Sequence, residues 1–267
     1  MGKERLDILL VERGLCPSRS LAQKLILGGS VRVDDEPHFK PSEMIDLKAS
    51  VTLDAGPRFV SRGGEKLQAA LDAFHPDVAG RVCADVGAST GGFTDCLLQA
   101  GAARVYAIDV GYGQIALKLR NDPRVVLMER TNARFVESLP DPVYMAAIDA
   151  SFISLRILLP VVLRWLDQQE GRIIALVKPQ FEAGQKTVGR GRGVILDEKV
   201  HQEVVRGILE FGVSLGLSPT GLIYSPLTGP KGNHEFLVHL QLDDETPPPI
   251  TTLMETCFDQ AGTSDGG

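Results

Sequence analysis

The stretch ADVGASTGGFTD, residues 84–95, decides the fold of this chain. A run of β-forming residues, 81–86, ends in a glycine-rich turn, and a helical pattern begins at once. The next β-run, 104–110, places Asp109 about twenty residues beyond the turn, where a carboxylate can bind the ribose of an adenosine. The stretch therefore predicts a domain that binds an adenosyl cofactor.

Strand and helix patterns alternate from residue 81 onward. The β-runs lie at 81–86, 104–110, 124–129, 144–149, 172–178, 220–225 and 235–242, and the helical patterns at 92–100, 114–120, 155–167 and 198–215. Only about nine residues separate the last two runs, and a parallel crossover needs a dozen or more, so the last strand should be antiparallel. This predicts an α/β fold with a seven-stranded, mostly parallel sheet, the Rossmann-like arrangement of class I methyltransferases.

The glycine-rich turn favours S-adenosylmethionine over a dinucleotide. The dinucleotide fingerprint GxGxxG brings backbone close to a pyrophosphate, but here Ser89 stands in place of its second glycine. S-adenosylmethionine has no phosphate, so its turn needs no such cradle, and a dehydrogenase is disfavoured. Thr131 and Asn132 follow the third strand, where they could contact the adenine. The predicted cofactor-binding residues are Asp85, Gly87, Ser89, Thr90, Gly91, Gly92, Phe93, Asp109, Val110, Thr131 and Asn132.

The first fifty residues form a separate pattern. Two short amphipathic helices, with Ser18 as N-cap of the second and Gly28-Gly29 as its stop, precede β-runs at 31–33 and 51–53. This order resembles the S4 domain, a small RNA-binding module. The predicted RNA-binding residues of this region are Arg5, Arg19, Lys24 and Arg32. Without this resemblance, a solvated polar face would be the simpler explanation of these four residues.

We therefore divide the chain into four segments. Residues 1–55 form an S4-like α+β RNA-binding domain, 56–62 a linker, 63–245 the methyltransferase domain, and 246–267 a C-terminal tail.

Four ionisable residues are expected at one edge of the sheet. Asp149 ends the fourth strand, Lys178 ends the fifth, and Glu235 begins the seventh, whose reversed direction places its start at that edge. Lys66, on the helix before the first strand, could reach the same cleft. Each of the four could alone be a surface charge or half of a structural ion pair, but together they predict a catalytic site.

Composition limits the other possibilities. The four cysteines have no metal-ligand spacing, so we expect no metal site. No signal peptide or membrane-spanning run is visible, so we expect a cytoplasmic protein that does not bind membranes. The net charge is −6, so contacts with RNA must come from local basic patches. One such patch is the loop 180–193, whose predicted RNA-binding residues are Lys186, Arg190 and Arg192.

Seven stretches closely resemble the TlyA family of ribosomal RNA (cytidine-2′-O)-methyltransferases, which is related to the FtsJ/RrmJ methyltransferases. They are SRGGEKL (61–67), DVGASTGGFTD (85–95), DVGYGQ (109–114), DPRVVLMERTN (122–132), DASFISL (149–155), LVKPQFEAG (176–184) and GNHEFL (232–237). The resemblance implies that a Lys-Asp-Lys-Glu catalytic tetrad corresponds to Lys66, Asp149, Lys178 and Glu235. It also implies a cytidine of 23S rRNA as substrate, with 16S rRNA as a further candidate, and ribosomal subunits as partners; we expect a monomer.

A ribose 2′-hydroxyl must lose its proton as its oxygen attacks the methyl group. We expect Lys178 to accept or orient this proton, Asp149 and Glu235 to orient Lys178 and the hydroxyl, and Lys66 to hold the target sugar-phosphate. Two other readings stay open: a non-catalytic RNA-binding protein associated with the ribosome, and a membrane-active protein, because relatives are often labelled hemolysins. The complete tetrad argues against the first, and the absence of a spanning segment argues against the second.

Overall fold

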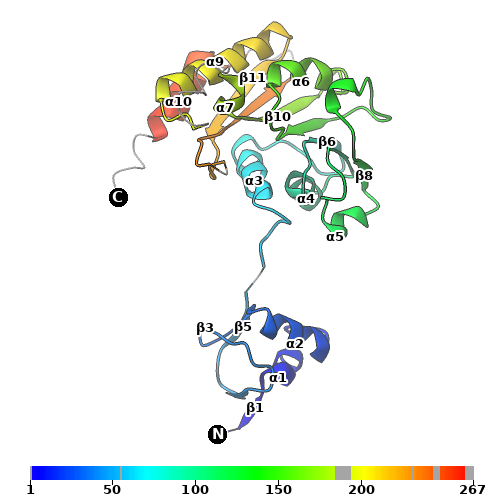
Figure 1. The fold of residues 1–267 in the computed structure, drawn as a ribbon, viewed down its shortest axis with the longest axis vertical. Helices are drawn as coiled ribbons and strands as arrows, with labels where there is room; N and C mark the ends of the chain where they lie inside the picture. The colour runs from blue at the N-terminus through cyan, green and yellow to red at the C-terminus, as the bar shows by residue number, and fades with distance from the viewer. Residues whose placement is uncertain (1, 55, 184–193, 230, 243–246, 262–267) are drawn as a thin grey trace. The chain divides into compact units, whose positions relative to one another are not determined.

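The computed structural model describes the 267-residue chain except residues 1, 55, 184–193, 230, 243–246 and 262–267 (Figure 1). The chain forms two compact units, Met1–Arg58 and Phe59–Gly267. Among the residues that the structure describes, no helix is long and apolar enough to cross a membrane.

The N-terminal unit consists of two helices and small antiparallel sheets. Its elements are β1 (Lys3–Arg5), α1 (Leu6–Glu12), α2 (Arg19–Leu27), β2 (Val31–Val33), β3 (Glu36–Pro37), β4 (Met44–Asp46) and β5 (Val51–Leu53). As expected, Ser18 caps α2, because its side chain accepts a hydrogen bond from the Leu21 N–H. Strands β1, β3 and β4 have no signal of their own in the sequence and exist through their pairing.

The second unit is an α/β domain. Its elements are α3 (Gly63–Phe74), β6 (Val82–Val86), α4 (Gly92–Gln99), β7 (Arg104–Ile108), α5 (Leu117–Arg120), β8 (Val125–Met128), the 3₁₀ helix η1 (Ala133–Phe135), β9 (Met145–Ile148), α6 (Leu155–Val162), β10 (Arg172–Val177), α7 (Pro179–Glu182), α9 (Glu198–Ser214), β11 (Ser218–Tyr224), β12 (Phe236–Gln241) and α10 (Ile250–Ala261).

The predicted sheet is confirmed. Seven strands follow the order β11-β12-β10-β9-β6-β7-β8, and β12 is antiparallel to both of its neighbours. The remaining pairs of β6 to β10 are parallel. The carboxyl ends of the parallel strands and the start of β12 therefore lie at one edge of the sheet, where ligands of open α/β sheets bind.

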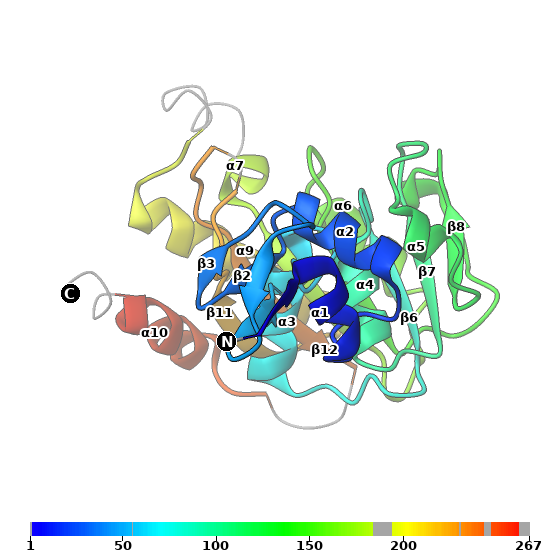
Figure 2. The same ribbon diagram turned by 90° about the horizontal axis from the view of Figure 1, so that it is seen from below.

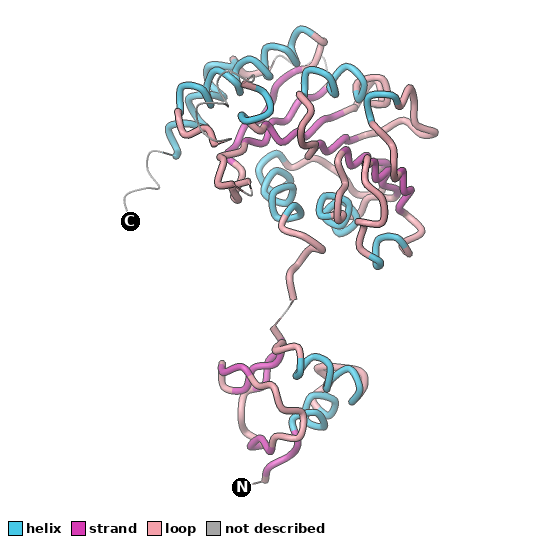
Figure 3. The backbone as a smooth tube through the Cα atoms, in the orientation of Figure 1, coloured by secondary structure: helices cyan, strands magenta, loops and turns pink. Residues whose placement is uncertain are grey.

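Helices cover both faces of this sheet, with α3 and α4 on one side and α6, α9 and α10 on the other (Figures 1 and 3). Alternate residues of each strand enter the two cores. In β6, Ala84 and Val86 pack with α6 and α9, whereas Cys83 packs with α3 and α4. Strands buried on both faces give the continuous apolar runs seen in the sequence.

The C-terminal segment differs from the expected tail. Helix α10 packs against the edge strand β11 and against α9, beyond the end of the sheet opposite to β8 (Figure 2). Met254, Cys257 and Phe258 are buried in the same core as β12. At the other end of this unit, Phe59 is buried in the core with α3, so part of the predicted linker belongs to the folded domain.

Candidate active site

The glycine-rich turn between β6 and α4 is shaped by backbone that only glycine adopts easily. Gly87 has φ +91° and Gly91 has φ +97°. A Cβ on Gly87 would lie 2.8 Å from the Asp149 carbonyl oxygen. The turn therefore packs directly on the backbone that follows β9.

Asp85, at the end of β6, supports this turn from inside the domain. Its Oδ2 accepts hydrogen bonds from the Thr94 N–H at 2.8 Å and the Thr94 hydroxyl at 2.6 Å. Asp85 is fully buried, and burial raises its pKa to about 7. The carboxyl group thus ties the end of β6 to the first turn of α4.

Asp109 follows β7 and contacts the turn from the side. Its Oδ2 accepts a hydrogen bond from the Ser89 N–H at 2.8 Å, and its Oδ1 accepts one from the Gly111 N–H at 2.6 Å. A carboxylate has about four lone-pair sites, so Asp109 retains acceptor capacity for ribose hydroxyls.

Two cavities open at this edge of the sheet. The first, called here the cofactor cavity, has a volume of about 520 Å³. The predicted cofactor residues that line it are Gly87, Ser89, Asp109, Val110, Thr131 and Asn132. The second, called here the acceptor cavity, has a volume of about 400 Å³. The predicted cofactor residues that line it are Gly87, Ser89, Thr90, Gly92 and Phe93.

The two cavities share a wall made of Gly87, Ser89 and Asp149. A group bound in one would therefore lie beside a group bound in the other. Two of the predicted cofactor residues, Asp85 and Gly91, line neither cavity; Asp85 supports the turn from inside, and Gly91 is the N-cap of α4.

The four ionisable residues form two ion pairs, in which Lys66, Glu235 and Lys178 are buried and Asp149 is partly buried. Lys178 Nζ lies 2.6 Å from Asp149 Oδ1, and Lys66 Nζ lies 2.5 Å from Glu235 Oε2. Lys66 and Asp149 both line the acceptor cavity, with Glu235 and Lys178 as their partners. The two pairs thus reach the same cavity from β9, β10, α3 and the start of β12.

Lys178 has a further acceptor that sequence reasoning missed. Its Nζ donates a hydrogen bond to Ser151 Oγ at 3.1 Å. Ser151 and Phe152 also line the cofactor cavity, and Phe152 is 90% exposed with φ +64°. A positive φ is unusual for a bulky residue and is often found at functional sites. The DASFISL motif contains both residues, but an irregular loop gives no periodic signal of its geometry.

The acceptor cavity also contains residues that were not predicted. Arg62, exposed at the start of α3, and Thr228, in the loop between β11 and β12, both line it. The SRGGEKL motif contains both Arg62 and Lys66. The motif therefore indicated that this segment belongs to the site, but only Lys66 was predicted from it.

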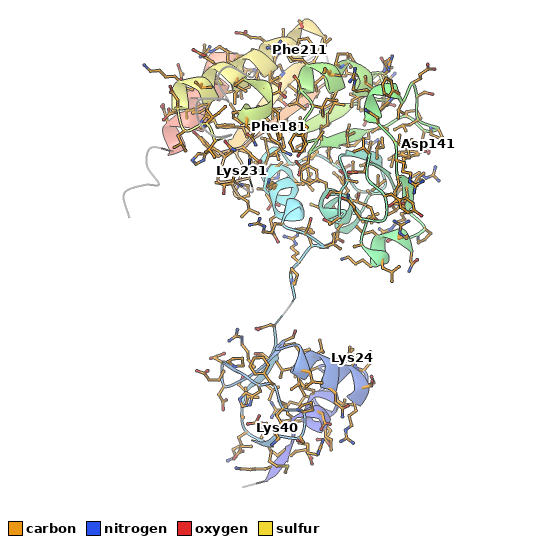
Figure 4. All side chains as sticks on the ribbon, viewed as in Figure 1. Lys24, Lys40, Asp141, Phe181, Phe211 and Lys231 are labelled. Carbon is orange, nitrogen blue, oxygen red and sulfur yellow. The ribbon has the colours of Figure 1, made fainter. Side chains whose placement is uncertain are left out.

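The predicted basic residues of the N-terminal unit are mostly engaged with carboxylates. Asp7 is fully buried and accepts hydrogen bonds from Arg5 Nε at 3.0 Å and from Arg19 Nε at 2.9 Å. These hydrogen bonds, above all those from Arg5, hold the pKa of Asp7 well below its usual range. Arg32 Nε lies 2.7 Å from Asp54 Oδ1, and Lys24 is exposed on α2 (Figure 4).

The remaining predicted RNA-binding residues, Lys186, Arg190 and Arg192, lie outside the described residues. Within the described part of the chain, no cluster of His, Cys, Asp or Glu has the composition of a metal site.

The cofactor cavity fits an adenosyl compound. Its volume falls in the range of small-molecule sites, roughly 300–1,000 Å³. Its wall combines apolar surface from Ile157 and Leu158 with a carboxylate, Asp109, that keeps free lone pairs. The turn at Gly87 leaves no room for a side chain, so a ligand would contact backbone there.

Two families match the chain. The FtsJ-like methyltransferase family matches residues 59–242, and the S4 domain family matches residues 4–50. The chain is 49% identical over 250 residues to YqxC of Bacillus subtilis, covering 91% of this chain and 87% of that one.

It is also 46% identical over 243 residues to a Mycobacterium tuberculosis protein named 16S/23S rRNA (cytidine-2′-O)-methyltransferase TlyA, covering 90% of each chain. A solved structure from Streptococcus thermophilus is similar over 99% of this chain and 98% of that one, with a TM-score of 0.74 and 40% identity.

Proposed function

We propose a function for a chain that belongs to the FtsJ-like methyltransferase family: it transfers the methyl group of S-adenosylmethionine to a cytidine ribose 2′-hydroxyl of ribosomal RNA. The relatives support rRNA as substrate, because one of them is named for methylation of cytidines in 16S and 23S rRNA. The S4 match supports RNA as the partner, and ribosomal subunits in the cytoplasm are the proposed substrates.

One observation carries the catalytic part of the proposal. Two lysine–carboxylate pairs from distant parts of the chain reach one cavity, and that cavity shares a wall with the cofactor cavity. Buried ion pairs cost desolvation free energy and are a weak way to stabilise a fold. Two of them beside a ligand cavity are better explained by chemistry than by stability.

The cofactor would be held by residues of the turn and of the neighbouring strand ends. Asp109 would bind the ribose, Thr131 and Asn132 would contact the adenine, and backbone at Gly87 would face the methionyl group. S-adenosylmethionine bound there supplies an electrophilic methyl group.

Lys178 is placed to handle the proton of the attacking hydroxyl. Its Nζ is fixed between Asp149 and Ser151, beside the wall that the two cavities share. As a neutral amine it can accept the 2′-hydroxyl proton at Nζ while the oxygen attacks. Asp149 orients Lys178 and lines the acceptor cavity, so it can also align the hydroxyl.

Lys66 and Arg62 would hold the target nucleotide. Both line the acceptor cavity, Lys66 with its amine fixed by Glu235 and Arg62 with an exposed guanidinium. Cations at these positions can bind the phosphates that flank the target ribose. Alignment of the two reactants in this way can lower the barrier by roughly 7–11 kcal/mol.

The test uses purified 50S and 30S subunits from a strain that lacks the gene. The protein and S-adenosylmethionine are added, the rRNA is digested to nucleosides, and methylated nucleosides are identified by mass spectrometry. We expect 2′-O-methylcytidine from 50S subunits, and reverse-transcription stops at low nucleotide concentration locate it. A methyl group on a base, or on the ribose of another nucleoside alone, would contradict the proposal.

The 30S arm decides the range of substrates. Appearance of 2′-O-methylcytidine in 16S rRNA would extend the activity to both subunits. The control is S-adenosylhomocysteine in place of S-adenosylmethionine, which fills the cofactor cavity without supplying a methyl group.

A further inference from the structure

Glu182 is the last residue of α7, one helical turn after Lys178, and its carboxylate contacts a different element. Oε2 accepts a hydrogen bond from the Ser154 hydroxyl at 2.6 Å, and Oε1 accepts one from the Leu155 N–H at 2.7 Å. The side chain is partly buried, and this burial raises the pKa of Glu182. A partly buried carboxylate that accepts two hydrogen bonds from the start of one helix fixes its own position relative to that helix.

The segment 149–155 is thereby attached to the segment 178–182 at two points. Lys178 contacts Asp149 and Ser151 at one point, and Glu182 contacts Ser154 and Leu155 at the other. A third contact lies between them, because the rings of Phe152 and Phe181 are 5.0 Å apart; Phe181 is labelled in Figure 4.

Capping of α6 does not by itself account for Glu182. The N-cap of α6 is Ser154, whose Oγ already accepts a hydrogen bond from the Arg156 N–H at 3.1 Å. Glu182 comes from another element, so its contacts fix the start of α6 relative to α7 and β10. Since Asp149 and Ser151 lie on the short segment that leads to α6, their positions relative to Lys178 depend on that attachment.

We propose that Glu182 is a positioning residue for methyl transfer: it holds Asp149 and Ser151 against Lys178 by anchoring the start of α6 to α7. This inference rests on the proposed function, which makes Lys178 and Asp149 catalytic. The same segment lines the cofactor cavity through Ser151, Phe152 and Ser154. Loss of the anchor should therefore loosen one wall of that cavity as well.

The test compares Glu182→Ala with Glu182→Gln. Alanine removes both acceptors, whereas glutamine keeps an oxygen for the Leu155 N–H and an amide group for Ser154. For Glu182→Ala we expect kcat for rRNA methylation to fall about 10- to 100-fold, because misplacement by 1 Å can cost a factor of 10². Glu182→Gln should stay within about threefold of the wild-type kcat, since it restores the geometry without the charge.

Asp167→Ala is the matched control. Asp167 Oδ1 also accepts two backbone hydrogen bonds, from the Gln169 and Glu170 N–H groups, but in the turn before β10, at the opposite edge of the sheet. This variant should lose stability and retain kcat. Wild-type kcat in Glu182→Ala, an equal loss in Glu182→Gln, or an equal loss in Asp167→Ala would overturn the assignment.

A second measurement does not depend on rRNA. S-adenosylhomocysteine affinity, measured by calorimetry, should weaken about tenfold in Glu182→Ala and remain unchanged in Glu182→Gln and Asp167→Ala. A wild-type protein that methylates no rRNA would contradict the proposed function, and these affinities would still decide the role of Glu182; equal affinities would refute it. If Glu182→Ala does not fold, Ser154→Ala removes the hydroxyl that donates to Glu182, together with the N-cap acceptor of α6, and wild-type affinity and kcat in that variant would refute the assignment.

Discussion

At the scale of single residues, Asp85 stabilises the glycine-rich turn although its carboxyl group lines neither cavity. It was predicted among the cofactor-binding residues, yet it lies under the turn and bonds to Thr94. Its burial has a thermodynamic consequence, because the unfolded chain ionises this group near pH 4 and the folded protein near pH 7.

Replacement of Asp85 by asparagine should change the pH dependence of stability. Between about pH 4 and pH 7 the folded protein binds one proton more than the unfolded chain at this group, so the free energy of unfolding falls as pH rises. Asparagine can accept the same two hydrogen bonds but does not titrate. We expect the stability of Asp85→Asn relative to wild type to increase by a few kcal/mol from pH 4 to pH 7, measured by urea denaturation. Parallel stability curves for the two proteins would contradict this.

The pair of Lys66 and Glu235 allows structural and catalytic roles to be separated. Removing one partner leaves the other charge buried and unpaired, which costs about 3–5 kcal/mol, whereas removing both avoids that cost. We expect Lys66→Met and Glu235→Gln each to lower the free energy of unfolding, and the double variant to recover most of it.

The rate of methyl transfer, measured for the same three variants, distinguishes a catalytic role of the pair from a structural one. If the pair is catalytic, the double variant stays inactive although its stability returns. Recovery of activity together with stability would assign the pair to the fold alone.

At the scale of elements, the turn between β6 and α4 is the most constrained piece of backbone. Gly87→Ala must move either the turn or the backbone at Asp149, because its Cβ would lie 2.8 Å from a carbonyl oxygen. We expect S-adenosylhomocysteine affinity to fall at least tenfold, with a stability loss of about 1–3 kcal/mol. Gly216→Ala is the control: it has φ +82° with no atom within 4 Å of the new Cβ, so it adds backbone strain without a clash. Equal affinity losses in both variants would disprove the steric account.

Helix α10 lies in the segment predicted to be a C-terminal tail. Phe258 is buried, with its ring centroid 5.5 Å from that of Tyr224 and 5.3 Å from that of Phe236. We expect Phe258→Ala to lower the free energy of unfolding by about 3–5 kcal/mol. An unchanged urea midpoint would mean that α10 behaves as the tail that was predicted.

The strands were predictable from sequence because both of their faces are buried. In β10, Ile173, Ala175 and Val177 enter one core and Ile174 and Leu176 enter the other, so residues 173–177 are apolar throughout and give a strong local signal. Helix α10 also has a local signal that the predicted tail overlooks, because Ile250, Leu253, Met254, Cys257 and Phe258 follow the i, i+3, i+4, i+7, i+8 spacing of an amphipathic helix. What the local pattern does not contain is the partner of this apolar face, since α10 packs against β11 and α9, which lie earlier in the chain.

At the scale of the whole molecule, an acidic protein is proposed to bind a polyanion. The net charge is −6, so its cations must be concentrated where RNA is expected. The structure gathers Arg5 and Arg19 around Asp7 in the N-terminal unit, and Arg62 and Lys66 at the acceptor cavity.

The site was predictable only as far as topology determines it. Strand ends and strand direction suffice to bring Asp149, Lys178 and Glu235 to one edge. The pairing of Lys66 with Glu235 rather than with Asp149, and the contacts of Ser151 and Glu182, depend on loop conformations and on packing across the sheet. Such contacts join residues far apart in sequence and have no periodic signal.

The central claim is that Lys178 accepts the hydroxyl proton during methyl transfer. Lys178→Arg tests it most directly, because arginine can still donate hydrogen bonds to Asp149 and Ser151 but cannot become a neutral base. Single-turnover methyl transfer from tritiated S-adenosylmethionine to purified 50S subunits should be at least about 100-fold slower in this variant, with unchanged S-adenosylhomocysteine affinity. A wild-type rate in Lys178→Arg would contradict the claim.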